Sequence, residues 1–172
     1  MKNNLLSFLL LLVLSLSCSS PNKDGYTDIN ELFRAFPEKL KSNDWNELEN
    51  YIAKIVPDQE TFAYMKKVNF SYRGLPEATA KTNFLAEYLR TFYLNNVLRF
   101  RVSLEKNDQL KDLKFVKVER EGSEMYDENL GIEATEAFII LASGDKTIRC
   151  KLGEMFKING TWRSFTEPKL GW

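Results

Sequence analysis

Residues 132–164 read IEATEAFIILASGDKTIRCKLGEMFKINGTWRS, and their pattern decides the fold class. β-branched and aromatic residues, often alternating with polar ones, predict strands over residues 132–142 and 146–158. Gly144-Asp145 supplies a turn between these two strands. The same composition predicts a further strand over residues 113–121. Strands that follow one another through short turns pair antiparallel, so the second half of the chain is predicted to form a mainly antiparallel sheet.

A second turn closes this stretch at Asn159-Gly160. A two-residue type I′ turn needs positive φ at both central residues, which Asn and Gly tolerate better than other residues do. The pair therefore predicts a hairpin whose last strand runs from Thr161 to about Thr166.

The chain before residue 113 has helical periodicity instead. Pro37 is expected to kink or interrupt the first helix. Each expected helix follows a residue suited to a cap or a first turn: Thr27 or Asp28, Asn43 or Asp44, Pro57-Asp58 and Pro76. The expected apolar faces are Ile29, Leu32, Phe33, Phe36 and Leu40; Trp45, Leu48, Tyr51, Ile52 and Ile55; Phe62 and Met65; and Phe84, Leu85, Tyr88, Leu89, Phe92 and Tyr93. Helices followed by strands predict an α+β fold in which the helices cover one face of the sheet.

The first residues have the layout of a secretory signal peptide. Lys2 is followed by the apolar run Leu5–Leu16, which is shorter than the ~20 residues of a membrane-spanning helix. Leu14-Ser15-Leu16-Ser17-Cys18 resembles the bacterial lipobox. This resemblance implies cleavage after residue 17 and a lipid on Cys18, which would hold the protein to a membrane. The alternative is an ordinary secreted protein cut nearby, in which Cys18 has no special role.

The leader divides the chain into three predicted parts. Residues 1–17 are the signal peptide, residues 18–26 a polar lipidated tether, and residues 27–172 one domain. Removal of the leader takes away Lys2 alone among the charged residues. The 24 basic residues then become 23, against 24 acidic ones, and the net charge is near −1. A near-neutral chain lacks the basic field that nucleic acid binding needs, so no nucleic-acid partner is expected.

The absence of histidine restricts the chemistry. Without it the usual general base and the commonest metal ligand are missing, which excludes Ser-His-Asp and Cys-His catalysis and histidine-based zinc sites. Cys150 lies between apolar residues in a strand pattern and is expected to be a buried core thiol. No phosphate loop or calcium loop occurs, and no cofactor is expected.

Two segments resemble the nuclear transport factor 2-like superfamily. Ser42–Leu48 (SNDWNEL) is similar to its opening helix pair, and Met155–Arg163 (MFKINGTWR) to its last hairpin. The resemblance covers about residues 28–168. It implies a curved sheet wrapped around a helix, often around a conical pocket. Members include isomerases, dehydratases, small-ligand binders, immunity proteins and envelope lipoproteins. The enzymes use an Asp-His or a Tyr-Asp pair, and a chain without histidine has access only to the second.

Glu136 is the candidate acid or base. It alternates with Ile132, Ala134, Phe138 and Ile140. In one register Glu136 points inward, where an apolar cone would raise its pKa. In the other register Ala137, Ile139 and Leu141 face the core and Glu136 faces solvent. Tyr88, Tyr93 and Trp162 either line a ligand pocket with it or fill the core.

These observations predict a lipid-anchored envelope domain that binds a protein or a small apolar ligand without catalysis. One alternative is an enzyme that transfers protons with Glu136 and Tyr88 or Tyr93. Another is a toxin-immunity protein. The shortage of suitable acid and base groups favours the non-catalytic reading.

Overall fold

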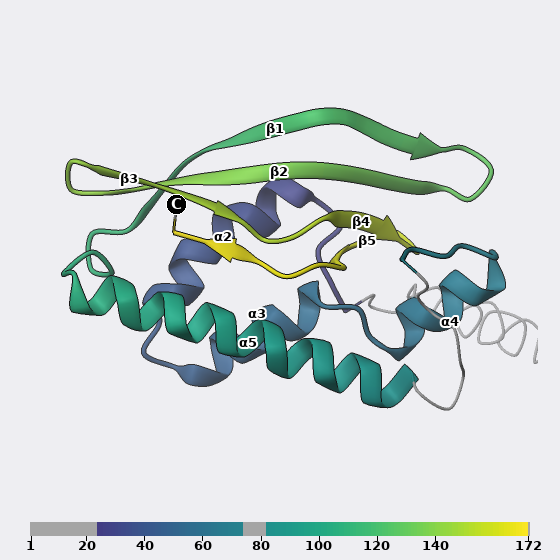
Figure 1. Ribbon diagram of the computed structural model, residues 1–172, viewed down its shortest axis with the longest axis horizontal. Coiled ribbons are helices and arrows are strands. Elements are labelled where there is room, and N and C mark those ends of the chain that lie inside the picture. The colour runs from purple at the N-terminus through teal and green to yellow at the C-terminus, as the bar shows by residue number, and fades with distance from the viewer. Residues whose placement is uncertain (1–23, 74–81, 172) are drawn as a thin grey trace, which may run out of the picture.

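The computed structural model describes residues 24–73 and 82–171 and has an α+β architecture in which helices precede strands (Figure 1). The α+β prediction is confirmed. The described helices are α2 (Ile29–Lys41), α3 (Trp45–Ile55), α4 (Gln59–Lys67) and α5 (Thr82–Lys106). The described strands are β1 (Lys114–Asp127), β2 (Ile132–Ser143), β3 (Lys146–Lys151), β4 (Met155–Ile158), β5 (Thr161–Ser164) and β6 (Lys169–Leu170).

Aspartates cap the first three of these helices. The side chains of Asp28, Asp44 and Asp58 accept hydrogen bonds from backbone N–H groups in the first turns of α2, α3 and α4, at 2.8, 2.9 and 2.7 Å. Helix α2 continues past Pro37 to Lys41, so of the kink or interruption predicted there, the interruption is wrong. Its buried apolar face, which includes Pro37 itself, offsets the hydrogen bond that proline cannot donate. The start of the last helix predicted at Pro76 lies outside the described residues.

Strand β2 is the centre of an unclosed sheet in which all the described pairings are antiparallel. Strand β1 pairs along one edge of β2. The other edge is divided between β3, which pairs with the second half of β2, and β4, which pairs with the first half. Strand β5 extends the sheet from β4, and β6 extends it from β3. Residues 159 and 160 both have positive φ, 51° and 81°, so the predicted hairpin turn is confirmed.

The single strand predicted over residues 146–158 is in fact two strands that separate around Gly153. This glycine has a φ of +100°. A Cβ at this position would lie 2.3 Å from Ser164 Oγ and 2.5 Å from the carbonyl oxygen of Thr166. The chain can therefore cross from the β3 half of the sheet to the β4 half only through a residue without a side chain.

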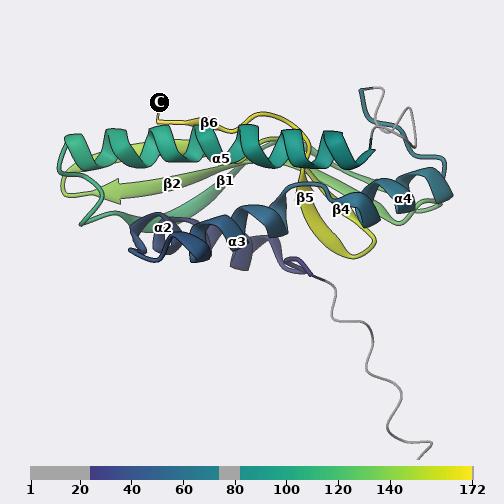
Figure 2. The same ribbon diagram turned by 90° about the horizontal axis from the view of Figure 1, so that it is seen from below.

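Helices α2, α3 and α5 lie beneath the sheet, with α5 on one side and α2 and α3 on the other (Figure 2). They bury their apolar faces in one cluster with Ala137, Ile139 and Leu141 of β2, which are at most 1% exposed. The register that places these three residues in the core is therefore the correct one. A smaller cluster joins Phe62 and Met65 of α4 to Ile132 of β2, to Phe156 and Ile158 of β4, and to Phe165, which follows β5. Trp45 is 40% exposed and does not share the buried face of α3.

The described chain begins against strand β5. The Trp162 N–H donates to the carbonyl oxygen of Tyr26 at 2.8 Å, and the Tyr26 ring packs edge-on against Tyr51. Asp24 is bonded to Arg163 through its carbonyl oxygen. Residues 24–26, the last three of the predicted tether, thus contact the domain. The predicted leader and Cys18 lie outside the described residues, and no helix within the described residues is long and apolar enough to span a membrane.

Candidate functional site

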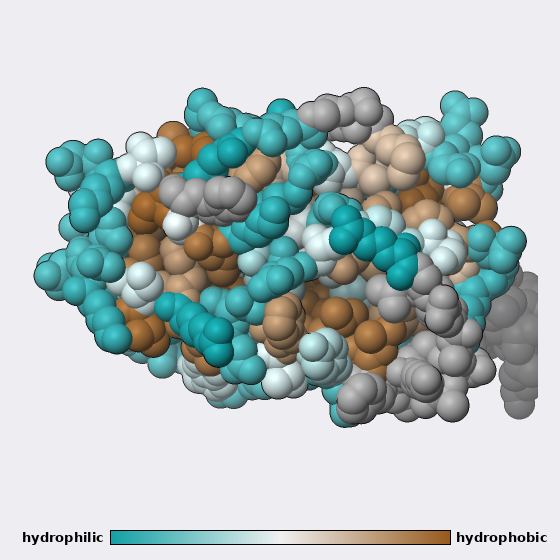
Figure 3. Space-filling view, in the orientation of Figure 1, coloured by the Kyte–Doolittle hydropathy of each residue, from teal (hydrophilic) through white to brown (hydrophobic). Residues whose placement is uncertain are grey.

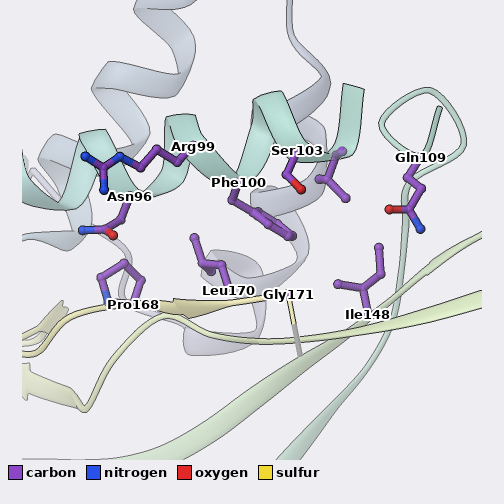
Figure 4. Close-up of a pocket in the computed structure, with 10 residues that line it drawn as sticks. Asn96, Arg99, Phe100, Ser103, Gln109, Ile148, Pro168, Leu170 and Gly171 are labelled. Carbon is purple, nitrogen blue, oxygen red and sulfur yellow. The ribbon is translucent and has the colours of Figure 1, made fainter. Parts of the chain in front are cut away.

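A pocket of about 480 Å³ lies between the second half of α5 and the strands β3 and β6 (Figure 4). We call it the α5 pocket. Its volume falls within the ~300–1,000 Å³ of small-molecule sites. The pocket is lined by Asn96, Arg99, Phe100, Ser103, Leu104, Gln109, Ile148, Pro168, Leu170 and Gly171.

The floor of the α5 pocket is apolar. Phe100 and Leu104 come from α5 and Ile148 from β3, and these side chains are 8%, 2% and 7% exposed. Leu170 of β6 completes the floor, opposite the Phe100 ring (Figure 4). Figure 3 shows hydrophobic side chains open to view in the left half of this face, above helix α5 and framed by hydrophilic ones. The apolar surface that the floor leaves open to a ligand therefore comes mainly from the half-buried Leu170 and from the edges of Phe100 and Ile148.

The rim of the α5 pocket is polar. Arg99 and Asn96 lie at one end and Gln109 at the other, with Ser103 between them along α5 (Figure 4). Asn96 Nδ2 donates to the Phe92 carbonyl oxygen at 3.0 Å. Among the lining residues that the structure describes, Arg99 alone is charged. The pocket thus combines an apolar floor with neutral polar side chains and the cationic Arg99 at its mouth.

Glu136 lies on the outer face of the sheet, on the side of β2 opposite Ala137 and the helices. Its carboxylate accepts a hydrogen bond from Lys151 Nζ, and half of its side chain is exposed. Arg149 lies over the neighbouring Phe138 ring at 3.5 Å and pairs with Glu121. Glu136 is therefore part of an ion-pair network on the outer face.

The two candidate tyrosines lie in different surroundings from Glu136. Tyr93 is 3% exposed, and its hydroxyl donates to the Leu152 carbonyl oxygen at 2.5 Å. Burial raises the pKa of Tyr93 well above its usual value, so the hydroxyl stays protonated. Tyr88 is 55% exposed on α5 and stacks on Phe92 with their ring centroids 6.1 Å apart. Both tyrosines belong to the helix on the inner face, whereas Glu136 lies on the outer one.

Trp162 lines a second pocket, of about 430 Å³, between the start of α2 and strands β1, β2 and β4. Its indole is 6% exposed, and Lys157 Nζ lies 5.9 Å from the ring centroid. Lys157 also pairs with Glu133 at 2.9 Å. The structure thus places Trp162, Glu136, Tyr88 and Tyr93 in four different surroundings and does not bring them together in one pocket.

Cys150 is fully buried, as the sequence predicts. Burial raises the pKa of its thiol to about 12, so the nucleophilic thiolate is scarce at neutral pH. Within the described ranges, no three Asp, Glu or Cys side chains are close enough together to hold a metal ion.

Sequence reasoning missed the α5 pocket because its residues come from three separate segments. Strand β6 has two residues and no pattern that predicts a strand. Val97, Phe100 and Leu104 form an ordinary buried face of α5, and the exposed Arg99 lies outside that face, so the local sequence gives no sign of the pocket. Comparison of the chain with protein-family models, with curated proteins and with solved structures found no match.

Proposed function

We propose that this protein is a bacterial envelope lipoprotein, anchored through Cys18, whose domain binds a small, largely apolar ligand in the α5 pocket without catalysis. The observation that carries the binding proposal is the pocket itself. It joins a suitable volume to an apolar floor and a few convergent polar groups, which is the usual composition of a ligand site.

The anchoring proposal is supported by the leader and by the start of the domain. The basic residue, the short apolar run and the residues around Cys18 follow the lipobox layout. Two or more acyl chains bind a membrane stably, at about 0.8 kcal/mol per buried CH₂ group. Asp24 is held to β5 by Arg163, and the six residue steps from Cys18 to Asp24 span at most about 22 Å. The proposed anchor thus keeps the β5 end of the domain near the membrane.

We also propose that the domain belongs to the nuclear transport factor 2-like superfamily. It is supported by the order of helices and strands, by the Asp44 cap before Trp45 and by the Asn159-Gly160 hairpin. The position of the α5 pocket between a long helix and the sheet is also compatible with a binding domain of that type.

The alternatives have less support. A proton-transfer enzyme with Glu136 and a tyrosine needs those groups within hydrogen-bond distance of each other. Glu136 is bonded to Lys151 instead, and the Tyr93 hydroxyl to the Leu152 carbonyl oxygen. An immunity protein needs a toxin partner, and no feature of the described surface points to one.

Filling the α5 pocket tests the binding proposal. Ser103 is exposed on α5 and lines the pocket, so Ser103→Trp places a large ring in the space without disturbing the core. Titration of the wild-type domain with octanol should show saturable binding, and Ser103→Trp should weaken it at least about tenfold. Ser103→Ala is the matched control and should bind as the wild type does. Equal octanol binding by all three proteins, or none by the wild type, would contradict the assignment of the pocket.

A further inference from the structure

We infer that the natural ligand of the α5 pocket is a small amphipathic carboxylate, whose acid group binds Arg99 and whose apolar part lies on Phe100, Ile148 and Leu170. This inference rests on the proposed function and adds the charge and orientation of the ligand. It follows from the electrostatics of the lining and from the arrangement of its polar and apolar parts.

Arg99 differs from the other arginines of α5. Arg90 pairs with Glu49 at 3.3 Å, and Arg101 pairs with Glu105 at 3.2 Å. Among the carboxylates of the described residues, none forms an ion pair with Arg99. Its side chain lies at the Asn96 end of the pocket (Figure 4), and the described residues of the lining include no acidic side chain. The planar guanidinium donates two parallel hydrogen bonds to a carboxylate, so an acid group is the ligand chemistry that it matches.

The rest of the rim fits the same head group. Asn96 lies beside Arg99 at this end of the pocket, above Pro168 (Figure 4). Since the described part of the lining holds the cationic Arg99 and no acidic side chain, an ammonium group beside Arg99 would meet unfavourable charge. The pocket is therefore expected to distinguish anionic from cationic amphiphiles that have the same chain.

The apolar floor sets the orientation of the ligand. Phe100 follows Arg99 directly in the helix, and its ring reaches from α5 toward the strands (Figure 4). Gly171 lies against this ring, because a Cβ on Gly171 would be 3.1 Å from Phe100 Cε2. The alkyl chain of a ligand whose head group binds Arg99 thus runs along Phe100 toward Ile148 and Leu170. Burial of its CH₂ groups there contributes most of the affinity. The head group adds specificity.

The experiment compares octanoate, octanol and octylamine, which share one chain and differ in charge, by calorimetric titration at neutral pH and low salt. We expect octanoate to bind the wild-type domain tighter than octanol by about fivefold and octylamine to bind more weakly than octanol. Equal affinity for octanoate and octanol, or preference for octylamine, overturns the carboxylate inference and leaves the pocket proposal intact. Binding of none of the probes overturns both.

Arg99→Gln removes the charge and keeps a polar side chain on an exposed helical position. It should remove the preference for octanoate, so that octanoate binds Arg99→Gln no tighter than octanol does. Arg90→Gln is the matched control on the same helix, outside the lining, and should leave all three affinities unchanged. An octanoate preference that persists in Arg99→Gln would show that the head group lies elsewhere and would overturn the inference.

Discussion

Gly153→Ala is expected to lower the free energy of unfolding by about 3–5 kcal/mol, the combined scale of backbone strain and overpacking. At a φ of +100° an alanine is strained. Its Cβ would also meet Ser164 Oγ at 2.3 Å and the Thr166 carbonyl oxygen at 2.5 Å. The second contact is with backbone, and hydrogen bonds on both sides hold that backbone in place. Thr166 Oγ1 accepts from the Glu154 N–H at 2.8 Å, and the Phe165 N–H donates to the Glu154 carbonyl oxygen at 3.0 Å.

Gly144→Ala is the matched control for this change. Gly144 has a φ of +59°, and a Cβ there would meet nothing within 4 Å. Its cost should be limited to the strain of a left-handed alanine, about 1–2 kcal/mol. Urea denaturation of the two variants separates the effects. Equal stability losses would mean that the contacts of Gly153 with Ser164 and Thr166 do not restrict this position.

Arg163→Met is expected to lower the free energy of unfolding by about 3 kcal/mol. Arg163 is 4% exposed in strand β5, and its guanidinium connects three segments. Nη2 donates to the Asp24 carbonyl oxygen at 2.6 Å and to Asp58 Oδ2 at 3.0 Å, while Nη1 donates to the Lys54 carbonyl oxygen. Methionine fills a similar volume but leaves these acceptors without their donor. The start of the domain and the end of α3 would then lose their connection to the sheet.

Arg90→Met is the control for charge removal at the surface. Arg90 is 45% exposed and pairs with Glu49 at the surface, so its loss should cost less than about 1 kcal/mol. Urea denaturation is again the measurement. A loss for Arg163→Met as small as that for Arg90→Met would show that the buried guanidinium does not hold the segments together. Limited proteolysis gives a second readout, because faster cleavage near Asp24 is expected in Arg163→Met.

Much of the fold could be predicted because its signals are local. An aspartate at a helix start bonds to N–H groups two or three residues away, and Asn159-Gly160 satisfies the φ requirement of its own turn. The interruption expected at Pro37 did not occur because the packing of α2 against the rest of the domain stabilises the helix through this residue. Burial of the whole face of α2 compensates for the missing hydrogen bond. The break at Gly153 could not be predicted for a similar reason, since the atoms that demand it belong to Ser164 and Thr166.

The sites were harder to predict, because they depend on the register of β2 and on contacts between distant segments. Glu136 precedes the unbroken apolar run of residues 137–142, in which both faces of β2 are buried at least in part, so alternation alone does not give the register. Phe138 is covered by Arg149, a cross-strand contact that periodicity does not show. Arg163 is visible in the sequence as a basic residue after Trp162, yet its buried contacts with Asp24 and Asp58 are distant in the chain. The α5 pocket likewise joins a helix to two strands.

The central claim, that a lipid on Cys18 anchors this domain, is tested most directly by the mass of the mature protein from the membrane fraction of the cells that make it. The predicted result is a chain that begins at Cys18 and carries a diacylglyceryl group, and a Cys18→Ser variant that lacks this group and appears in the soluble fraction. A membrane-bound protein with an unmodified Cys18, or a mature chain that begins at another residue, would contradict the account.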